Sequence, residues 1–130
     1  MILDTSAIVA VLLREQGYEA LANAVTSSLS VSVGTPTLVE SELVLVGRLG
    51  YDGRSIVGDL VNDYDIRIAP FSLEHWRAAG SAFVRFGKGR HPAGLNYGDC
   101  MAYATARLAE EPLLCLGNDF AKTDLQLVSC

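Results

Sequence analysis

The chain has 130 residues, of which 50% are hydrophobic and 19% are charged. A chain of this size can bury a core of its own, so we expect a single soluble domain over residues 1–130. The formal net charge of −5 argues against binding nucleic acid through overall positive charge, because phosphate binding depends on clustered lysine and arginine. The longest strongly apolar run, residues 7–13, is too short to cross a bilayer and has no basic segment before it, so we expect neither a membrane span nor a signal peptide.

The three cysteines, Cys100, Cys115 and Cys130, lack the close pairing of a zinc site or a redox motif. We interpret them as reduced thiols, which predicts a cytoplasmic protein. His75 likewise has no second ligand at metal-binding distance in the sequence. We therefore do not expect a site built from histidine and cysteine.

The chain opens with a short apolar run, Met1 to Leu3, that stops at Asp4. The run suits a buried strand, and a carboxylate at the carboxyl end of a strand faces the ligand crevice of an open α/β sheet. Thr5 and Ser6 follow as caps for a helix over residues 7–13, and they place hydroxyl and N–H groups beside the carboxylate. The simpler alternative is that Asp4 is only the N-cap of that helix.

The rest of the chain alternates helices with short strands. Apolar spacing predicts helices over residues 18–28, 36–49, 56–64, 73–85 and 97–111. Short apolar or alternating runs predict strands over residues 31–33, 66–69 and 113–116, and we expect a last edge strand over residues 127–128. This alternation is typical of an α/β fold.

The helix over residues 36–49 carries two glutamates, Glu40 and Glu42. If Ser41 is the centre of the polar face, the two side chains lie about 100° to either side of it. Periodicity therefore leaves open which glutamate points at the edge of the sheet, and a surface position is the alternative for each.

Positive charge is concentrated after the helix over residues 73–85. The apolar stripe of this helix consists of Leu73, Trp76, Ala79, Gly80 and Phe83. Arg85, Lys88 and Arg90 follow within a segment that contains no acid, and the last two lie in a glycine-rich loop over residues 87–94. Such a loop suits anion binding, although a solvated connection is the alternative, and it lacks the Lys-Ser/Thr ending of a Walker loop.

Two further acids stand near the end of the chain. Asp99 follows the expected N-cap Asn96 and lies in the first turn of a helix, where a plain capping role is the alternative. Asp119 comes soon after the apolar run of residues 113–116, with Asn118 before it. This is the second place in the chain where an acid follows an apolar strand.

Four carboxylate positions therefore stand out: Asp4, Asp99, Asp119 and one of the two glutamates. If the strands are parallel neighbours, their carboxyl ends share one edge of the sheet and these groups converge there. Two carboxylates about 4 Å apart repel by about 4 kcal/mol at a surface-like dielectric, so the cluster needs a cation. Ligands that are all oxygen select a hard ion, Mg²⁺ or Mn²⁺. A hard ion beside a basic loop is an arrangement used to hydrolyse phosphodiesters.

Four segments carry a resemblance to a known family. They are Leu3-Asp4-Thr5-Ser6, the helix with Glu40, the Gly-Lys-Gly-Arg-His stretch that leads to Leu95-Asn96-Tyr97-Gly98-Asp99-Cys100, and Gly117-Asn118-Asp119-Phe120. In this order, and over the full chain, they resemble a PIN-domain ribonuclease of the VapC toxin type. The run from Gly87 to Cys100 is the most specific part of the resemblance.

The resemblance implies a PIN-like α/β fold with a central parallel sheet of four to five short strands flanked by helices. It also implies RNA cleavage that depends on Mg²⁺ or Mn²⁺, a homodimer, and neutralisation by a VapB-type antitoxin. It selects Glu40 over Glu42, so the catalytic and metal-binding acids become Asp4, Glu40, Asp99 and Asp119, supported by Thr5 and Ser6. Many relatives have an acid where this chain has Asn118, which leaves the fourth ligand open between Asp119, the Asn118 amide oxygen and water.

The basic segment has an expected role in this setting. Arg85, Lys88 and Arg90 lie at the end of a helix and in a loop that ends shortly before Asp99. We expect their side chains to be solvated, to add little to stability and to position RNA phosphates over the metal edge.

Other classes of protein fit the sequence less well. A haloacid-dehalogenase-like phosphatase needs a second Asp two residues after the first, where this chain has Ser6. A receiver domain needs an acidic pair at the first strand, which is also missing. The alternative is a non-catalytic PIN-like RNA-binding or assembly module, which metal-dependent turnover of RNA would separate from the enzyme.

Overall fold

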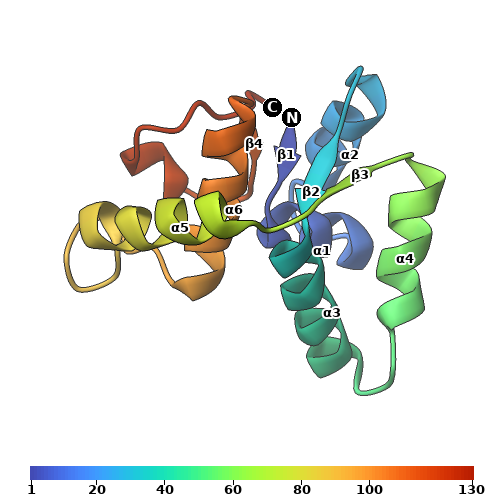
Figure 1. The fold of residues 1–130 in the computed structure, drawn as a ribbon. Helices are drawn as coiled ribbons and strands as arrows, with labels where there is room; N and C mark the ends of the chain where they lie inside the picture. Colours follow the sequence, from blue (N-terminus) through green and yellow to red (C-terminus); the bar gives the residue numbers. More distant parts are fainter.

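The computed structural model describes residues 1–130 and contains a four-stranded parallel sheet with the strand order β3-β2-β1-β4. The strands are β1 (Ile2–Leu3), β2 (Ser32–Gly34), β3 (Arg67–Ala69) and β4 (Leu113–Leu114). The helices are α1 (Thr5–Leu13), α2 (Tyr18–Ser27), α3 (Thr35–Leu49), α4 (Arg54–Asp63), α5 (Leu73–Phe86) and α6 (Tyr97–Ala109), with a 3₁₀ turn η1 over Phe120–Lys122. The predicted α/β class with a parallel sheet flanked by helices is confirmed (Figure 1). None of these helices has the length and apolar character needed to span a membrane.

β1 lies in the middle of the sheet, between β2 and β4. Ile2 pairs with Ser32 on one side and with Leu113 on the other. β1 and β4 are covered on both faces, since Leu113 and Leu114 are divided between the same two cores as Ile2 and Leu3. This explains why residues 2–3 and 113–114 are apolar without alternation. Asp4 follows β1 directly and therefore stands at the middle of the sheet's carboxyl edge.

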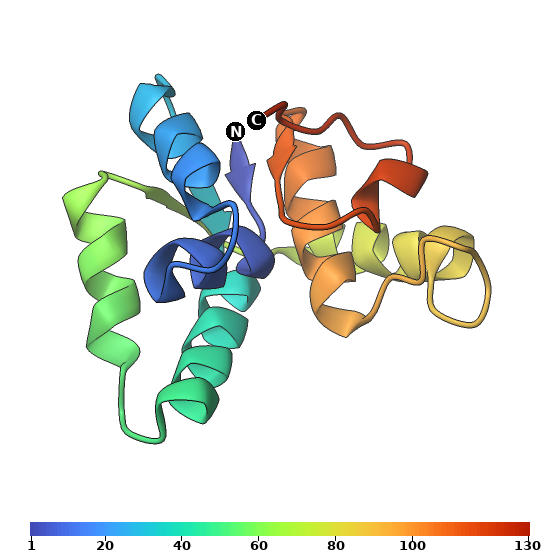
Figure 2. The same cartoon turned by 180° about the vertical axis from the view of Figure 1, so that it is seen from behind.

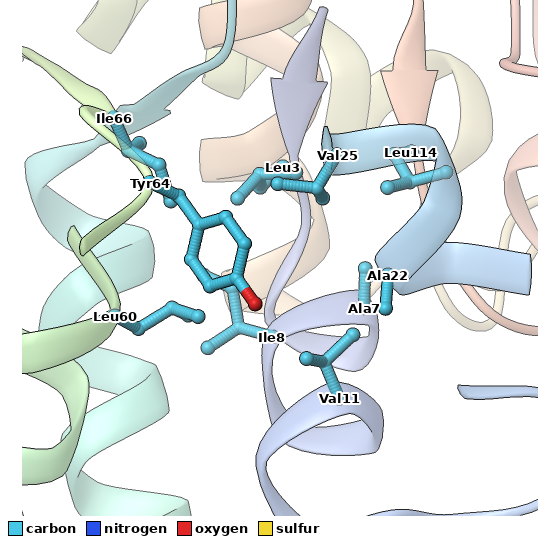
Figure 3. A pocket seen from close by; sticks show the side chains of 10 residues that line it. All are labelled: Leu3, Ala7, Ile8, Val11, Ala22, Val25, Leu60, Tyr64, Ile66 and Leu114. Atoms are coloured by element: carbon cyan, nitrogen blue, oxygen red, sulfur yellow. The ribbon is translucent and has the colours of Figure 1, made fainter. Parts of the chain in front are cut away.

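The two residues of β1 belong to two different cores, because successive side chains of a strand point to opposite faces. Ile2 packs into a core with α5, α6 and the end of the chain, and Leu3 packs into a core with α1 and α2. Figure 2 shows these two halves of the molecule on either side of β1. Figure 3 looks into the second core, where Ile8, Leu60 and Tyr64 help to enclose an apolar void of about 10 Å³. A void of this size holds at most one water molecule, so the core is closely packed.

α3 packs with its polar stripe inward, which the sequence did not predict. Thr37 and Ser41 are buried together with Leu45, while Val39 and Leu43 are exposed. The Ser41 hydroxyl donates to the Thr37 carbonyl oxygen at 2.7 Å, so its burial leaves no polar group unpaired. The small side chains of this stripe let α3 lie close to α1 and α6.

The apolar stripe predicted for α5 does not face the core as a whole. Ala79 is buried, but Leu73 and Trp76 are exposed and Phe83 is partly exposed. The stripe borders an open groove between α5 and α6 with a volume of about 700 Å³. Its lining is mostly apolar and includes Phe71, Trp76, Phe83, Leu95 and Met101.

The segment after η1 adds only a partial edge to the sheet. Leu127 makes a single parallel bridge with Leu113, and the Val128 N–H donates to the Leu113 carbonyl oxygen at 2.9 Å. The expected fifth strand at residues 127–128 is therefore reduced to one bridge.

Candidate functional site

A cavity of about 390 Å³ opens at the carboxyl edge of the sheet, between β1, α1, α3 and the start of α6. Its lining consists of Asp4, Thr5, Ser6, Val9, Glu15, Glu40, Val44, Arg48, Asp99, Leu116 and Gly117. Three predicted acids, Asp4, Glu40 and Asp99, thus reach one cavity from positions far apart in the chain. We call this space the acid cavity.

Asp4 is 4% exposed and is the N-cap of α1. One of its carboxylate oxygens, Oδ2, accepts from the Ser6 N–H at 3.0 Å and from the Ser6 hydroxyl at 2.5 Å. The same hydroxyl oxygen accepts from the Leu116 N–H at 2.9 Å, which links Asp4 to the chain that leaves β4. Because Asp4 caps the helix, α1 begins at Thr5 rather than after Thr5 and Ser6. Burial raises the pKa of Asp4, the bonds from Ser6 oppose this rise, and the Glu40 carboxylate adds to it.

Glu40 is the glutamate of α3 that lines the cavity. The Thr5 hydroxyl donates a short hydrogen bond to Glu40 Oε1, which connects α3 to the start of α1. Glu42 is not part of the lining, and its charge acts on Arg54 of α4 instead. Burial of the Ser41 stripe leaves both glutamates equally placed, and the contacts of Glu40 with Thr5 of α1 and Gly98 of α6 identify it as the one that faces the site.

Asp99 is half-buried in the first turn of α6 and forms a capping box with Asn96. The Asn96 N–H donates to Asp99 Oδ2 at 3.0 Å, and the Asp99 N–H donates to Asn96 Oδ1 at 2.9 Å. Burial raises the pKa of Asp99 to about 6, the Asn96 hydrogen bond opposes the rise, and the charges of Asp4, Glu40 and Asp119 add to it. The capping role and the cavity role therefore belong to the same carboxyl group.

Asp119, the last of the four predicted acids, does not line the acid cavity. Asp119 is exposed at the start of η1, and Asn118 beside it is exposed as well. Their neighbours Leu116 and Gly117 do line the cavity. Asp119 is close enough for its charge to raise the pKa of Asp99, so it borders the site without reaching into it.

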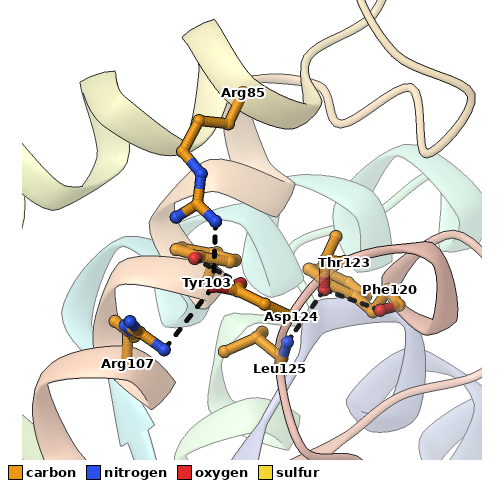
Figure 4. A network of polar contacts seen from close by, with 7 residues as sticks. All are labelled: Arg85, Tyr103, Arg107, Phe120, Thr123, Asp124 and Leu125. Carbon is orange, nitrogen blue, oxygen red and sulfur yellow. Dashed lines mark hydrogen bonds and ion pairs between the residues drawn. The ribbon is translucent and has the colours of Figure 1, made fainter.

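The three basic residues expected to bind RNA are all exposed, but they differ in their partners. The Arg85 guanidinium pairs with Asp124 Oδ2 at 3.1 Å and lies 4.7 Å from the centre of the Phe86 ring. Figure 4 shows Arg85 from α5 and Arg107 from α6 meeting at Asp124. Arg85 is exposed, as expected, but its head group is paired with Asp124 instead of being free.

Lys88 and Arg90 are exposed, but neither lines the acid cavity. Lys88 borders the groove between α5 and α6, and Arg90 Nε donates to the Val84 carbonyl oxygen at 3.1 Å. The loop over residues 87–94 therefore flanks the groove instead of covering the acids.

The structure adds two residues that the sequence analysis missed. Arg48 and Glu15 both line the acid cavity, and Arg48 Nη1 lies 3.0 Å from Glu15 Oε1. A signal for Arg48 was available, because it follows Glu40 by two helical turns and residues at this spacing share a face. Arg48 is the only cationic side chain in the lining.

The donor chemistry of the cavity fits a hard divalent cation. Asp4, Glu40 and Asp99 offer only oxygen, and the charges of Asp4 and Glu40 add to the rise that burial causes in the pKa of Asp99. No three histidine, cysteine, aspartate or glutamate side chains lie close enough to surround one ion. Mg²⁺ does not require such a cage, since it keeps several waters and binds through one or two carboxylates. Cys115 does not line the cavity, and burial raises the pKa of its thiol to about 12.

Comparison with known proteins places this chain in a family. Residues 1–125 match the family model described as PIN domain. Ribonuclease VapC36 of Mycobacterium tuberculosis is 45% identical over 127 residues, which cover 97% of this chain and 91% of that protein. Ribonuclease VapC of Mycolicibacterium smegmatis is 37% identical over 128 residues, which cover 98% of this chain and 99% of that protein.

Solved structures show the same fold. Mycobacterium tuberculosis VapC20, described as a sarcin-ricin loop cleaving toxin, has a TM-score of 0.79 at 16% identity, and the match covers 99% of this chain and 98% of that chain. VapBC2 from Rickettsia felis, solved with a DNA fragment from its promoter, has a TM-score of 0.74 at 12% identity and covers 98% of this chain and 96% of that chain. The family model and the relatives above 30% identity together establish that this chain belongs to the PIN-domain family, in its VapC branch.

Proposed function

We propose that this chain is an endoribonuclease toxin that cleaves RNA phosphodiester bonds with Mg²⁺ or Mn²⁺ and is neutralised by a VapB-type antitoxin. The observation that carries the proposal is the acid cavity, where Asp4, Glu40 and Asp99 come together from β1, α3 and α6. The names of the relatives, all ribonucleases of the VapC type, support the same reaction.

In this proposal Asp4, Glu40 and Asp99 hold the cation, and Asp119 or Asn118 approaches from the rim. A hard cation bound there supplies a Lewis acid that activates water and offsets the charge on the scissile phosphate. The protein holds its acids through neutral donors: the Ser6 hydroxyl for Asp4 and the Thr5 hydroxyl for Glu40. These donors orient the carboxylates without cancelling their charge.

Asp99 presents one free carboxylate oxygen to the acid cavity. Its Oδ2 already accepts from the Asn96 N–H at 3.0 Å, so Oδ1 is the oxygen that would bind the cation. Arg48 at the rim then contacts an RNA phosphate, and Lys88 and Arg90 contact the strand farther out.

Two surfaces of the chain suit binding of an antitoxin, the acid cavity and the groove between α5 and α6. A basic side chain of the antitoxin, above all an arginine, can occupy the acid cavity as a bidentate substitute for the cation. The groove between α5 and α6 is mostly apolar and suits an amphipathic helix. A toxin–antitoxin complex from Klebsiella pneumoniae and VapBC2 from Rickettsia felis have the same fold as this chain. Homodimer formation is part of the same proposal.

The decisive experiment measures RNA cleavage by the purified chain in Mg²⁺ and in EDTA. We expect turnover only with the metal, and we expect Asp4→Asn and Asp99→Asn each to abolish it while the protein stays folded by circular dichroism. A non-catalytic RNA-binding module would bind RNA equally in both buffers and cleave it in neither. Wild-type turnover by either variant at saturating Mg²⁺ would remove the metal-nuclease proposal.

A further inference from the structure

Gly98 lies directly against the Glu40 carboxyl group. It is a buried residue in the first turn of α6. A Cβ atom at this position would stand 1.9 Å from Glu40 Oε2, 2.5 Å from Cδ and 2.6 Å from Oε1. These are the three nearest atoms, and all of them belong to one side chain. Gly98 does not have a positive φ angle, so the position demands glycine for space and not for backbone conformation.

We propose that Gly98 is a positioning residue of the active site, which sets the location of the Glu40 carboxylate. The proposal rests on the proposed function, since that function makes Glu40 and Asp99 partners in one reaction. Without a side chain at position 98, the first turn of α6 can approach α3 closely enough to bring Asp99 beside Glu40. On its other side the Glu40 carboxylate accepts from the Thr5 hydroxyl. The Glu40 carboxylate is therefore held between the Thr5 hydroxyl and the backbone of Gly98.

This geometry predicts an uncommon response to Gly98→Ala. The atoms that the new methyl group meets are the end of a flexible side chain, so the fold can accommodate it by moving Glu40. That movement costs the hydrogen bond from Thr5 and displaces the carboxylate, and a displacement of about 1 Å can reduce catalysis by about a hundredfold. Gly58→Ala is the matched control, because Gly58 is an exposed helical glycine of α4 with nothing within 4 Å of its added Cβ.

The first test is a double-mutant cycle on RNA cleavage with Gly98→Ala and Glu40→Asp. Aspartate withdraws the carboxyl group by about one bond length, about 1.5 Å, so the methyl group at position 98 no longer meets it. We expect Gly98→Ala alone to lower kcat by about a hundredfold with little change in KM. In the Glu40→Asp background we expect almost no further loss, and Gly58→Ala should leave kcat unchanged. Equal losses in both backgrounds would mean that the two positions act independently and would overturn the proposal.

A second readout does not depend on cleavage. In EDTA we compare the melting temperature shift caused by Gly98→Ala in the wild-type and Glu40→Ala backgrounds. Alanine is favoured over glycine in helices, so the shift should be positive without the Glu40 carboxyl group and smaller with it, because the bond from Thr5 is then lost. Equal shifts in both backgrounds would show that no carboxylate is displaced. If the wild-type chain cleaves no RNA, the proposed function fails, and this melting comparison still decides whether Gly98 positions Glu40.

Discussion

Asp99 closes the first turn of α6 and also lines the acid cavity, so one carboxyl group serves both folding and chemistry. Burial raises the pKa of Asp99 to about 6, whereas an unfolded chain gives about 3.9. The folded state therefore binds the proton more tightly than the unfolded state. The stability that the proton provides is complete below about pH 4 and is lost as the pH rises to about 6.

We predict that Asp99→Asn raises the melting temperature in EDTA at neutral pH and flattens its dependence on pH between about 4 and 6. Asparagine still offers an acceptor to the Asn96 N–H, so the cap remains while the charge disappears. Thermal melts across this pH range measure the effect. Parallel curves for wild type and variant would show that Asp99 is not the group that titrates.

Arg48 can contact RNA from the rim of the acid cavity, but its ion pair with Glu15 competes with that contact. We predict that Arg48→Ala weakens binding to unrelated single strands and reduces the slope of log K against log salt by about 0.7 per lost contact. Glu15→Gln should tighten binding, because it releases Arg48. Filter binding at several salt concentrations measures both effects.

Arg54→Ala is the control for loss of one positive charge. Arg54 is fully exposed, pairs with Asp52 at 2.8 Å and lies outside the cavity. An equal loss of affinity in both arginine variants would mean that net charge, and not position, governs RNA binding.

At the scale of elements, Asp124 fastens the segment after η1 to α5 and α6. It accepts from the Tyr103 hydroxyl at 2.6 Å and pairs with Arg85 at 3.1 Å and Arg107 at 3.6 Å. Burial works to raise the pKa of Asp124, but these donors outweigh it and keep the pKa below its usual value. The Thr123 hydroxyl donates to the Phe120 carbonyl oxygen at 2.7 Å, which ties the same segment to η1 (Figure 4).

We predict that Arg85→Ala lowers the free energy of unfolding by about 0.5–1 kcal/mol, as expected for a partly exposed ion pair. Amide exchange should also become faster around Asp124. Lys88→Ala is the matched control and should leave stability and exchange unchanged, because Lys88 has no ion pair. Denaturant titration and hydrogen exchange compare the two variants. Equal stability of Arg85→Ala and Lys88→Ala would contradict the role of the Arg85–Asp124 pair in anchoring the segment after η1.

The sequence predicted the order and type of these elements, because apolar runs and capping residues act locally. It did not predict which side of α3 and of α5 faces the core, because this depends on the elements that pack against each helix. Ser41 is buried because its hydroxyl bonds within the helix and its small volume lets α6 approach. Asp4 and Asp99 were predicted from a strand end and a helix start, and Glu40 was selected by the family resemblance. The pairing of Arg85 with Asp124, in contrast, depends on a contact across 39 positions of the chain.

For the whole molecule, exposed large apolar side chains are most numerous on α5, which carries Leu73, Trp76, Phe83 and Val84, and α3 adds Val39 and Leu43. Leu43 is 69% exposed on α3 and Trp76 is 66% exposed on α5. Large apolar side chains gathered on a surface usually mark a contact with another protein. They are consistent with a homodimer, an antitoxin complex or both.

We predict that the chain alone sediments as a dimer and that Trp76→Lys shifts it toward the monomer, because a buried charge opposes association. Analytical ultracentrifugation over a range of concentrations measures the shift. Tyr51→Lys is the control, since Tyr51 is also exposed but lies in the turn between α3 and α4. If the wild-type chain stays monomeric, the prediction of a dimer is wrong, and the exposed apolar side chains would then contact the antitoxin only.

The position of β1 between β2 and β4 has a consequence for synthesis on the ribosome. Domains generally begin to fold from the amino terminus as the chain emerges, but β1 receives its second neighbour only when Leu113 and Leu114 have been made. Asp4 and Glu40 are then already present, while Asp99 arrives late and needs α6 to form. A nascent chain therefore carries no complete acid cavity until most of it has been translated.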